Sequence, residues 1–462
     1  MAHKFNLIVI FLFFTGLSIQ LSFAQKANRK VTENLLAKIE ISSMVSDSYT
    51  FSKNMRRIAF RIKSGNKQMV VVDGKSGNSY DYVSMPVFSP DSRQFAYAAR
   101  NGSNWYIIKD EIQKAVELAT DILTVQFSPD SKSFAYVLKI DNKFCFNLND
   151  NFGKYYDKID ENSITFSADS KTFSYCAEIN KKQCIVINGN EGAFFKQVGF
   201  PILSSDGKNC TYWATDVNQT YVVLDNKKSQ PYESIGALTL SNDGKHCAYT
   251  VVQKGKSFVV WNNKESEKYE WVHSLTFSYD GTRLGYLMEL AEGDKEGFKQ
   301  FAVIDGEKIG PFETVVEGTL EFSNDAKSVV FKAEKHDEFY MVCNGKEGKR
   351  YNDIIQLTTA FSPDNLRLAY AAEYNMKRMV IENDKESVPY NDIFAISFSP
   401  DNKRNAYSVR IDNKDLVVVD GQKGGKYDSI MGQGEIVFDS PDEFHYISRK
   451  GNSIYLVEEK FE

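Results

Sequence analysis

Cysteine and histidine are scarce in this sequence, with six and five residues, respectively, among 462. The spacing of the cysteines is neither that of a disulfide-dense scaffold nor that of a zinc site. The histidines beyond the N-terminal segment are His246, His273, His336 and His445. Because they fall at different positions of the repeat described below, they predict no shared metal centre. A Gly-x-Ser-x-Gly motif, which would mark the nucleophile of an α/β-hydrolase, is also missing.

The chain also lacks a large excess of either charge. Its 56 Lys and Arg residues face 61 Asp and Glu residues, and the formal net charge is −5. This balance creates no basic field that would attract nucleic acid. We therefore expect no nucleic-acid partner.

Beyond the first 24 residues, no segment is apolar enough to cross a bilayer. The N-terminus differs: Lys4 precedes an apolar run from Leu7 to Ile19, and small residues follow at Ser22 and Ala24. This is the layout of a secretory signal peptide, and an uncleaved membrane anchor is the alternative. We expect residues 1–24 to be removed and the remainder to be exported to the periplasm or the cell exterior.

A ten-residue phrase recurs along the whole chain. It begins with Phe or Leu and Ser, passes through a polar turn that usually contains Asp, and ends with an aromatic residue, as in "FSPDSRQFAY" at Phe88. Successive copies start 37 to 45 residues apart. They begin at Phe51, Phe88, Phe127, Phe166, Leu203, Leu240, Phe277, Phe322, Phe361, Phe398 and, in degenerate form, Phe438. Eleven copies indicate a repeat architecture.

Each copy is followed by two further phrases. An apolar run closed by Asp-Gly, Asn-Gly or Asn-Asn, such as "MVVVDG", favours positive φ and a tight hairpin. An aromatic-acid-x-aliphatic phrase comes next, such as "YDYV" at Tyr80. Each unit then reads as four short strands. A period near 40 residues with four strands per unit predicts an all-β fold, a β-propeller.

The phrase "FSPD-x-(K/R)-x-x-AY" followed by "VVVDG" resembles the TolB-like, WD40-like β-propeller repeats of bacterial exported proteins, from about residue 38 to the end. The resemblance implies a propeller fold and mainly a binding role, and it supplies no catalytic residues. It also implies an order of strands in each blade: inner strand a entering Phe-Ser, b at "FAY", c at "VVVDG" and d at "YDxI". Residues 25–50, with "AKIEISSMV" from Ala37, then contain the strand that completes the last blade.

The number of rings stays open at this point. One ring usually has four to eight blades, which favours two rings of about five and six blades in residues 51–462. One unusually large ring fits the uniform spacing. A boundary between two rings would fall near 225–270, because the turns that begin at Asp225 and Asn262 lack glycine.

The repeated aspartates and tyrosines are predicted to be structural. An Asp in a turn accepts hydrogen bonds from the amides that follow it, and a repeated turn requires one in each unit. The alternative is a ring of metal or sugar ligands. The aspartates are Asp91, Asp130, Asp169, Asp206, Asp243, Asp280, Asp325, Asp364 and Asp401. The tyrosines, which we expect to pack between blades, are Tyr97, Tyr136, Tyr175, Tyr212, Tyr249, Tyr286, Tyr370 and Tyr407.

The hairpins between strands b and c vary most among the copies and are often basic. We expect them to gather on one face and to form a rim that binds an anionic glycan or an acidic protein, with solvated hairpin tips as the alternative. The candidate binding residues are Lys181, Lys182, Lys377 and Arg378.

Together these patterns predict an exported, non-enzymatic β-propeller that binds a cell-envelope protein or polymer, without a cofactor, metal or catalytic residues. Any membrane association would come only through that partner. The alternative is a propeller enzyme, a glycan lyase or hydrolase or a peptidase relative, with its reactive groups in the central cavity. Of the cysteines, only Cys176 and Cys184 face each other across one b–c hairpin, and whether they are bridged stays open.

Overall fold

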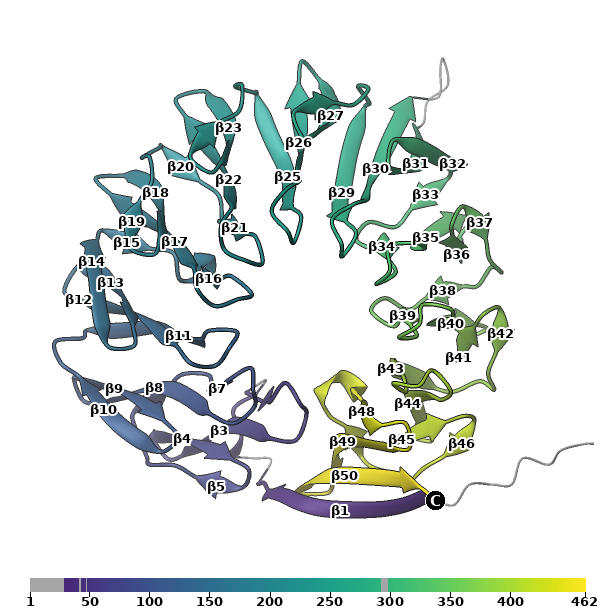
Figure 1. The fold of residues 1–462 in the computed structure, drawn as a ribbon. Helices are drawn as coiled ribbons and strands as arrows, with labels where there is room; N and C mark the ends of the chain where they lie inside the picture. Colours follow the sequence, from purple (N-terminus) through teal and green to yellow (C-terminus); the bar gives the residue numbers. More distant parts are fainter. Residues whose placement is uncertain (1–28, 41–42, 47, 292–297) are drawn as a thin grey trace, which may run out of the picture.

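The structure, a computed structural model, describes residues 29–40, 43–46, 48–291 and 298–462. In these residues the strands form eleven antiparallel sheets, which stand side by side in one closed ring around a central opening (Figure 1). The fold is therefore an eleven-bladed β-propeller, as the repeat predicts. The predicted signal peptide, residues 1–24, lies outside the described residues. Among the described residues, no helix is long and apolar enough to cross a membrane.

The two-ring alternative and its boundary near 225–270 are wrong. Asp225 and Asn226 have φ of 48° and 63°, and Leu224 pairs with Lys227 across them. Asn262 and Asn263 repeat this geometry, with φ of 49° and 63°. Asp and Asn tolerate the left-handed region well, so they form the same two-residue hairpin that Asp-Gly forms elsewhere. The missing glycines therefore do not mark a crossing between rings.

We number the blades 1 to 11 along the chain, and each has four strand positions. The inner position is split in two in several blades. The inner strands are β2 (Thr50–Phe51), β6 (Tyr82–Val83) with β7 (Val87–Phe88), β11 (Asp121–Phe127), β15 (Lys158–Ile159) with β16 (Thr165–Phe166), β20 (Gln197–Val198) with β21 (Ile202–Leu203), β25 (Ser234–Leu240), β29 (Trp271–Phe277), β33 (Thr314–Val315) with β34 (Glu321–Phe322), β38 (Asp353–Ile354) with β39 (Ala360–Phe361), β43 (Asp392–Phe398), and β47 (Ser429–Ile430) with β48 (Val437–Ser440). Short 3-10 turns are η2 (Glu161–Ser163) and η3 (Gly432–Gly434).

The second and third positions carry the regular hairpins of the blades. The second strands, at "FAY", are β3 (Ile58–Ser64), β8 (Phe95–Asn101), β12 (Phe134–Ile140), β17 (Phe173–Ile179), β22 (Cys210–Asp216), β26 (Cys247–Gln253), β30 (Leu284–Ala291), β35 (Val329–Lys335), β40 (Leu368–Tyr374), β44 (Asn405–Ile411) and β49 (Glu443–Lys450). The third strands, at "VVVDG", are β4 (Lys67–Val72), β9 (Asn104–Lys109), β13 (Lys143–Leu148), β18 (Lys182–Ile187), β23 (Gln219–Leu224), β27 (Lys256–Trp261), β31 (Phe298–Ile304), β36 (Glu338–Cys343), β41 (Lys377–Glu382), β45 (Lys414–Val419) and β50 (Ser453–Phe461).

The outer position corrects the predicted order of strands. In blades 1 to 10 it follows the turn that ends strand c, as in β5 (Lys75–Ser76), and it contains at most the first aromatic residue of the "YDxI" phrase, Tyr156 or Phe312. That phrase links two blades: Tyr80 bridges to Gln68 of blade 1, whereas Val83 pairs with Ala99 of blade 2. The other outer strands are β10 (Ile112–Val116), β14 (Asn151–Tyr156), β19 (Asn190–Glu191), β24 (Lys227–Lys228), β28 (Lys264–Glu265), β32 (Glu307–Phe312), β37 (Lys346–Glu347), β42 (Lys385–Glu386), β46 (Gln422–Lys423) and β1 (Arg29–Lys38).

The N-terminal strand closes the ring, as predicted, but from a position further upstream. β1 pairs antiparallel with β50 and forms the outer strand of blade 11 (Figure 1). Of the predicted segment from Ala37, only its first two residues belong to this strand. Met44 instead bridges to Ile62 of blade 1, where the linking phrase of the other blades lies. Closure removes the open edge that β50 would otherwise present.

Apolar clusters fill the spaces between consecutive blades. The cluster at the closure joins Ala37 and Ile447 of blade 11 to Phe60 and Val71 of blade 1, all at most 4% exposed. It is built like the cluster between blades 2 and 3, which contains Ala98 and Tyr136. The first and last blades therefore pack as any other neighbours do.

Candidate functional site

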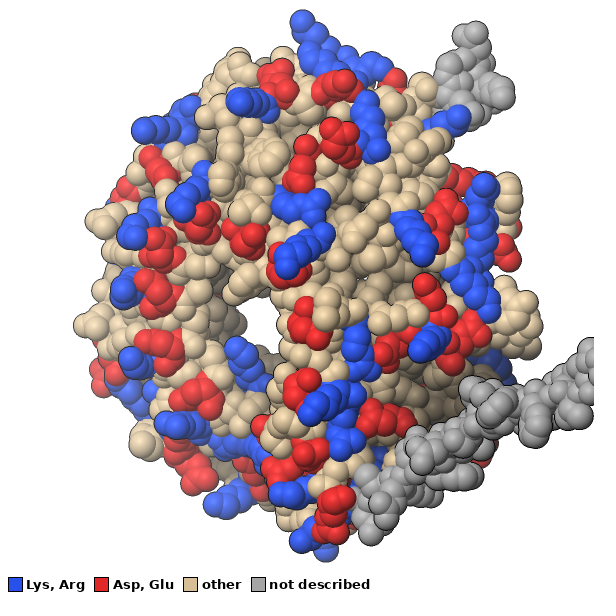
Figure 2. Space-filling model, turned by 45° about the vertical axis from the view of Figure 1, so that its right-hand side comes forward, with Lys and Arg blue, Asp and Glu red and all other residues tan. Residues whose placement is uncertain are grey.

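The aspartate turns form the inner rim of the ring. The turns that follow β11, β16 and β21 point to the central opening (Figure 1), and the opening passes through the molecule (Figure 2). Residues of the first four turns, among them Phe51, Phe88, Pro129 and Phe166, line a hollow of about 520 Å³ there.

Each aspartate side chain accepts hydrogen bonds from groups of its own turn. In blade 2, Asp91 Oδ1 accepts the Ser89 hydroxyl (2.6 Å) and the Arg93 amide (3.1 Å), and Gln94 N donates to Ser89 Oγ. These hydrogen bonds, first that of Ser89, lower the pKa of Asp91. The Ser-hydroxyl and amide bonds recur in all nine copies. The prediction of a structural role is confirmed.

The turns also connect neighbouring blades. The amide of Asp91 donates to Ser131 Oγ of blade 3 (2.9 Å), and the amide of Asp130 donates to Ser170 Oγ of blade 4 (2.8 Å). Between blades 11 and 1, His445 connects the two blades instead. Its Nε2 lies 2.7 Å from the carbonyl oxygen of Asn54 in blade 1, and its Nδ1 lies 2.7 Å from Asp439. Arg56 adds ion pairs to Asp439 (2.9 Å) and Glu458 (2.6 Å).

The repeated tyrosines pack between blades, as predicted. All eight are at most 4% exposed. Tyr249 of blade 6, for example, stands edge-on to Tyr232 of the link from blade 5, with ring centroids 5.9 Å apart. A buried aromatic ring at each interface supplies a large apolar contact. These side chains are not available as an exposed platform for sugars.

The four predicted binding residues do not form one site. Lys181 and Lys182 project from the hairpin of blade 4, and Lys377 and Arg378 lie on the hairpin of blade 9, on the other side of the opening (Figure 1). Lys181, Lys182 and Lys377 are exposed. Arg378 is half-buried and forms ion pairs with Glu373 (3.0 Å) and Asp392.

Other basic residues of the hairpins are held by the acid of the linking phrase. Lys67 pairs with Asp81 (2.7 Å), and Asp81 Oδ2 also accepts the amide of Gly102 in the hairpin of the next blade (2.6 Å). Lys143 and Asp157 repeat this pair at 2.6 Å. The acid thus fixes two hairpins at once, and acidic and basic groups alternate over the surface (Figure 2). A continuous basic rim is not present on the described hairpins.

Five of the six cysteines are buried, and Cys343 is partly exposed. Ala177, not Cys176, lies opposite Cys184 in the register of β17 and β18. Cys176 packs against blade 5 and Cys184 against blade 3, on opposite faces of the sheet. Both are unbridged, as are the other four. Burial raises the pKa of each of these two thiols to about 12, so both stay protonated at neutral pH.

In the described residues, no group of three or more His, Cys, Asp and Glu side chains is placed to hold a metal ion. A cluster of titratable groups lies between blades 7 and 8. His273 Nδ1 is 3.3 Å from Ser274 Oγ and 3.7 Å from Glu317 Oε1. Because both partners face the same nitrogen, this is not the relay of a catalytic triad, which uses one nitrogen for each partner.

Beside this cluster, a pocket of about 180 Å³ opens between the inner strands of blades 8 and 9 and is lined by Glu317, Glu321 and Lys332. Desolvation raises the pKa of the Glu321 carboxyl. Lys332 is buried and bonded to Asp353 (2.5 Å).

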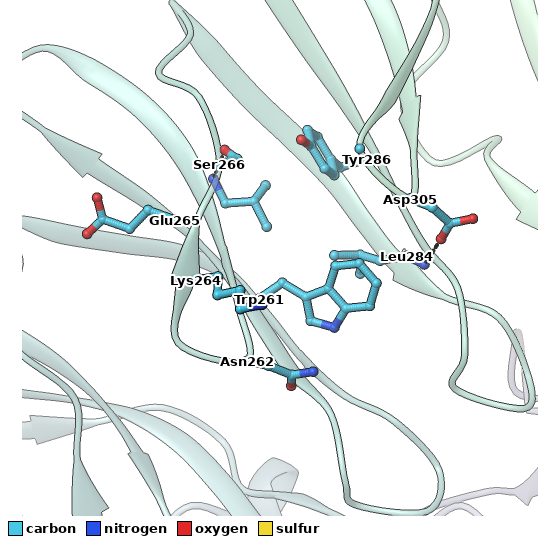
Figure 3. A pocket seen from close by; sticks show the side chains of 10 residues that line it. Trp261, Asn262, Lys264, Glu265, Ser266, Leu284, Tyr286 and Asp305 are labelled. Atoms are coloured by element: carbon cyan, nitrogen blue, oxygen red, sulfur yellow. Dashed lines mark hydrogen bonds between the residues drawn. The ribbon is translucent and has the colours of Figure 1, made fainter.

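The most apolar of the larger pockets lies between blades 6 and 7, with a volume of about 370 Å³; we call it the 6/7 groove. Trp261, Leu284 and Tyr286 form its walls, with Glu265 and Asp305 on opposite sides (Figure 3). The groove lies where strand c and the outer strand of one blade meet strand b of the next. Similar pockets lie between blades 1 and 2 and between blades 9 and 10.

Sequence reasoning overlooked this groove, although one signal was present. Trp261 is the last residue of its third strand, where six of the other third strands end in aliphatic residues, such as Val72, Leu224 and Val419. A tryptophan at this mostly aliphatic position marks a departure from the repeat. Its ring stands edge-on to Phe277 of blade 7, with centroids 6.4 Å apart.

Comparisons with known proteins identify no family. No family model matches the chain, and no curated protein matches it. Several solved structures resemble it. A eukaryotic initiation factor is 13% identical with a TM-score of 0.41, and the match covers 80% of this chain and 96% of that one.

TolB from Acinetobacter baumannii is 12% identical with a TM-score of 0.25, over 54% of this chain and 73% of that one. The β-propeller domain of the Trilobed protease from Pyrococcus furiosus is 15% identical with a TM-score of 0.29, over 58% of this chain and 96% of that one. The fold is therefore assigned from the eleven sheets of this chain and not from these similarities.

Proposed function

We propose that this protein is an exported, non-enzymatic β-propeller that binds a protein or polymer of the cell envelope. The observation that carries the proposal is the hairpin of blade 9. Tyr374 and Met376 are 49% and 88% exposed there, beside the exposed Lys377. Exposed apolar side chains next to a cation suit a protein partner better than a solvated loop does.

The base of this hairpin is rigid. Arg378 holds it through Glu373 and Asp392, and the Asn375 amide donates to Asn352 of the linking phrase (2.8 Å). A rigid scaffold that presents a few exposed side chains is a common basis for recognition. In this proposal Lys377 contacts the partner, whereas Arg378 positions the hairpin.

Capture of partners from an envelope fraction tests the proposal. The bait is the mature chain, and the variant carries Tyr374→Ser, Met376→Asn and Lys377→Ser. We expect the variant to lose a partner that the original protein retains. The matched control, Asp412→Ser with Asn413→Ser, changes the equivalent hairpin of blade 10 and should retain that partner. A partner retained by all three proteins would contradict the role of blade 9, and no specific partner at all would contradict the binding function.

The second candidate is an enzyme that acts on a glycan or peptide in the central opening. Desolvation raises the pKa of Glu321, which lines one pocket with Glu317, and this favours the candidate because a raised carboxyl pKa suits a general acid. Incubation with envelope glycans, followed by new reducing ends or the ultraviolet absorbance of an unsaturated product, tests this candidate. Activity that survives Glu321→Gln would exclude this site, and a measured loss would displace the non-enzymatic proposal.

A further inference from the structure

The groove between blades 10 and 11 shows what such an inter-blade space accommodates. Arg29, the first residue of β1, lies in it with its side chain only 8% exposed. Its guanidinium forms an ion pair with Glu459 (2.6 Å), donates to the carbonyl oxygen of Gln422 (2.9 Å), and lies 5.4 Å from the ring centroid of Phe444. A carboxylate, a carbonyl and an aromatic ring thus hold a buried cation.

Hydrogen bonds show that the wall of the 6/7 groove formed by blade 6 is equivalent to the wall that blade 10 forms in the groove around Arg29. Gly424 donates its amide to Val417 O at 2.8 Å, and Ser266 donates its amide to Val259 O at 2.8 Å. Gly424 borders Arg29 closely: a Cβ placed there would lie 3.1 Å from Arg29 Nη2. Ser266 takes the corresponding place in the 6/7 groove.

The opposite walls, formed by blade 11 and by blade 7, are equivalent as well. Glu459 lies opposite Phe444 in the register of β49 and β50. Asp305 lies opposite Leu284, whose carbonyl oxygen accepts the Asp305 amide at 2.8 Å. Asp305 therefore occupies the place of the carboxylate that holds Arg29.

The 6/7 groove offers the same chemistry, and no side chain of the described residues fills it. Trp261 supplies an aromatic wall and Asp305 supplies a carboxylate (Figure 3). By register, the Lys264 carbonyl corresponds to that of Gln422. Apolar walls shield a bound cation from water and strengthen its contact with an aromatic ring.

We propose that the 6/7 groove binds an arginine side chain presented by an extended segment of a partner protein. The inference rests on the binding function proposed above and names one feature of the partner. The guanidinium lies against Trp261 and toward Asp305, while the aliphatic part of the side chain contacts Leu284 and Val259.

Several charged groups surround this position. Asp305 already accepts hydrogen bonds from the Leu284 amide (2.9 Å) and Arg283 Nε (2.7 Å), and Glu265 accepts one from Gln230 (3.0 Å). Lys264 lines the groove and has the same charge as the proposed ligand. Arginine binding should therefore tighten when Lys264 is neutralised, whereas binding of an anion should weaken.

The probe is the blocked tripeptide N-acetyl-Ala-Arg-Ala-amide, titrated into the purified mature protein and followed by tryptophan fluorescence. We expect a dissociation constant in the millimolar range, about that of a single anchoring side chain. The same peptide with citrulline, which keeps the shape and loses the charge, should bind about fivefold more weakly. Equal binding of the two peptides, or no binding of either, would overturn the proposal.

Variants locate the site. Asp305→Asn and Trp261→Leu should each weaken arginine binding several-fold, and Lys264→Gln should strengthen it. Asn occupies the position of Asp305 in other blades, as at Asn344, so this variant is compatible with the turn. Trp271→Leu, at an exposed tryptophan elsewhere in blade 7, is the matched control and should leave binding unchanged.

Weaker binding in Lys264→Gln would show a preference for anions and would overturn the proposal. The titration uses only purified protein and peptide, so its failure is distinct from a failure to capture an envelope partner.

Discussion

The groove between blades 10 and 11 and the 6/7 groove are built from equivalent residues, yet only the first is filled. In the groove between blades 10 and 11, Arg29 forms an ion pair with Glu459 and lies over the aromatic ring of Phe444. Between blades 6 and 7, Trp261 and Asp305 line an open space. The repeat therefore sets the backbone geometry of these inter-blade grooves, and the side chains that differ between blades determine whether a groove is filled or open.

Removal of residues 29–38 should have the largest effect on this comparison, because it empties the closing groove and exposes the edge of β50. We expect the free energy of unfolding to fall by at least about 5 kcal/mol, since a buried ion pair accounts for about 3–5 kcal/mol and each buried apolar side chain for about 1.5–3 kcal/mol. Size-exclusion chromatography and thermal melting measure the outcome. A monomer with an unchanged melting temperature would show that β1 does not close the ring; recovery on adding the 29–38 peptide would show that it does.

The substitution Arg29→Ala converts the filled groove into an open one and leaves the strand in place. Glu459, whose side chain is fully buried, then has no cation beside it. We expect a loss of about 3–5 kcal/mol in chemical denaturation, because an unpaired buried charge is costly.

Two further variants interpret that result. Arg29→Met with Glu459→Gln should recover much of the loss, since no charge is left buried. Lys132→Ala removes an exposed pair with Asp130 (3.8 Å) and should change stability by less than about 0.5 kcal/mol. A similar cost for Arg29→Ala and Lys132→Ala would mean that the closing groove is solvated.

Trp261→Val makes the 6/7 groove resemble its closing counterpart, in which Val419 occupies the same position. The variant loses the edge-on contact with Phe277 and widens an already open space. Because the tryptophan is only partly buried, we expect a cost of about 1–3 kcal/mol, below that of a fully buried aromatic residue. Denaturation with fluorescence measures it, and a cost near zero would show that Trp261 contributes nothing to the interface and serves only a ligand.

The repeat phrases allowed two features to be predicted: the eleven blades, and the completion of the last blade by an N-terminal strand. Both follow from strand alternation and turn residues, which are local signals. The aspartate turn was predictable for the same reason: the side-chain hydrogen bonds that shape it, among Ser89, Asp91 and Gln94, lie within six residues.

What depends on distant partners was not predictable in this way. The number of rings follows from how each sheet packs on the next, and no turn sequence encodes that angle. The place of β1 depends on its pairing with β50, more than 400 residues away. Likewise, nothing near Arg378 in the sequence reveals that Asp392 holds it, or that Leu284 and Trp261 share a groove.

Blades 6, 7 and 10 contain the same aspartate turn, and none of these turns lines the 6/7 groove, so a change in one should have the smallest effect. The Ser241 hydroxyl and the Lys245 amide lower the pKa of Asp243 to about 2, from an ordinary value of 3.8. A carboxylate with a lowered pKa in the folded state contributes stability above its unfolded pKa and loses it as the pH falls toward the folded one. Wild-type stability should therefore decline between about pH 4 and 2, and Asp243→Asn should reduce that slope slightly while remaining folded at neutral pH. Asn54 already makes the same bonds in blade 1, so collapse of the variant at neutral pH would show that the turn requires the charge and not only the acceptor.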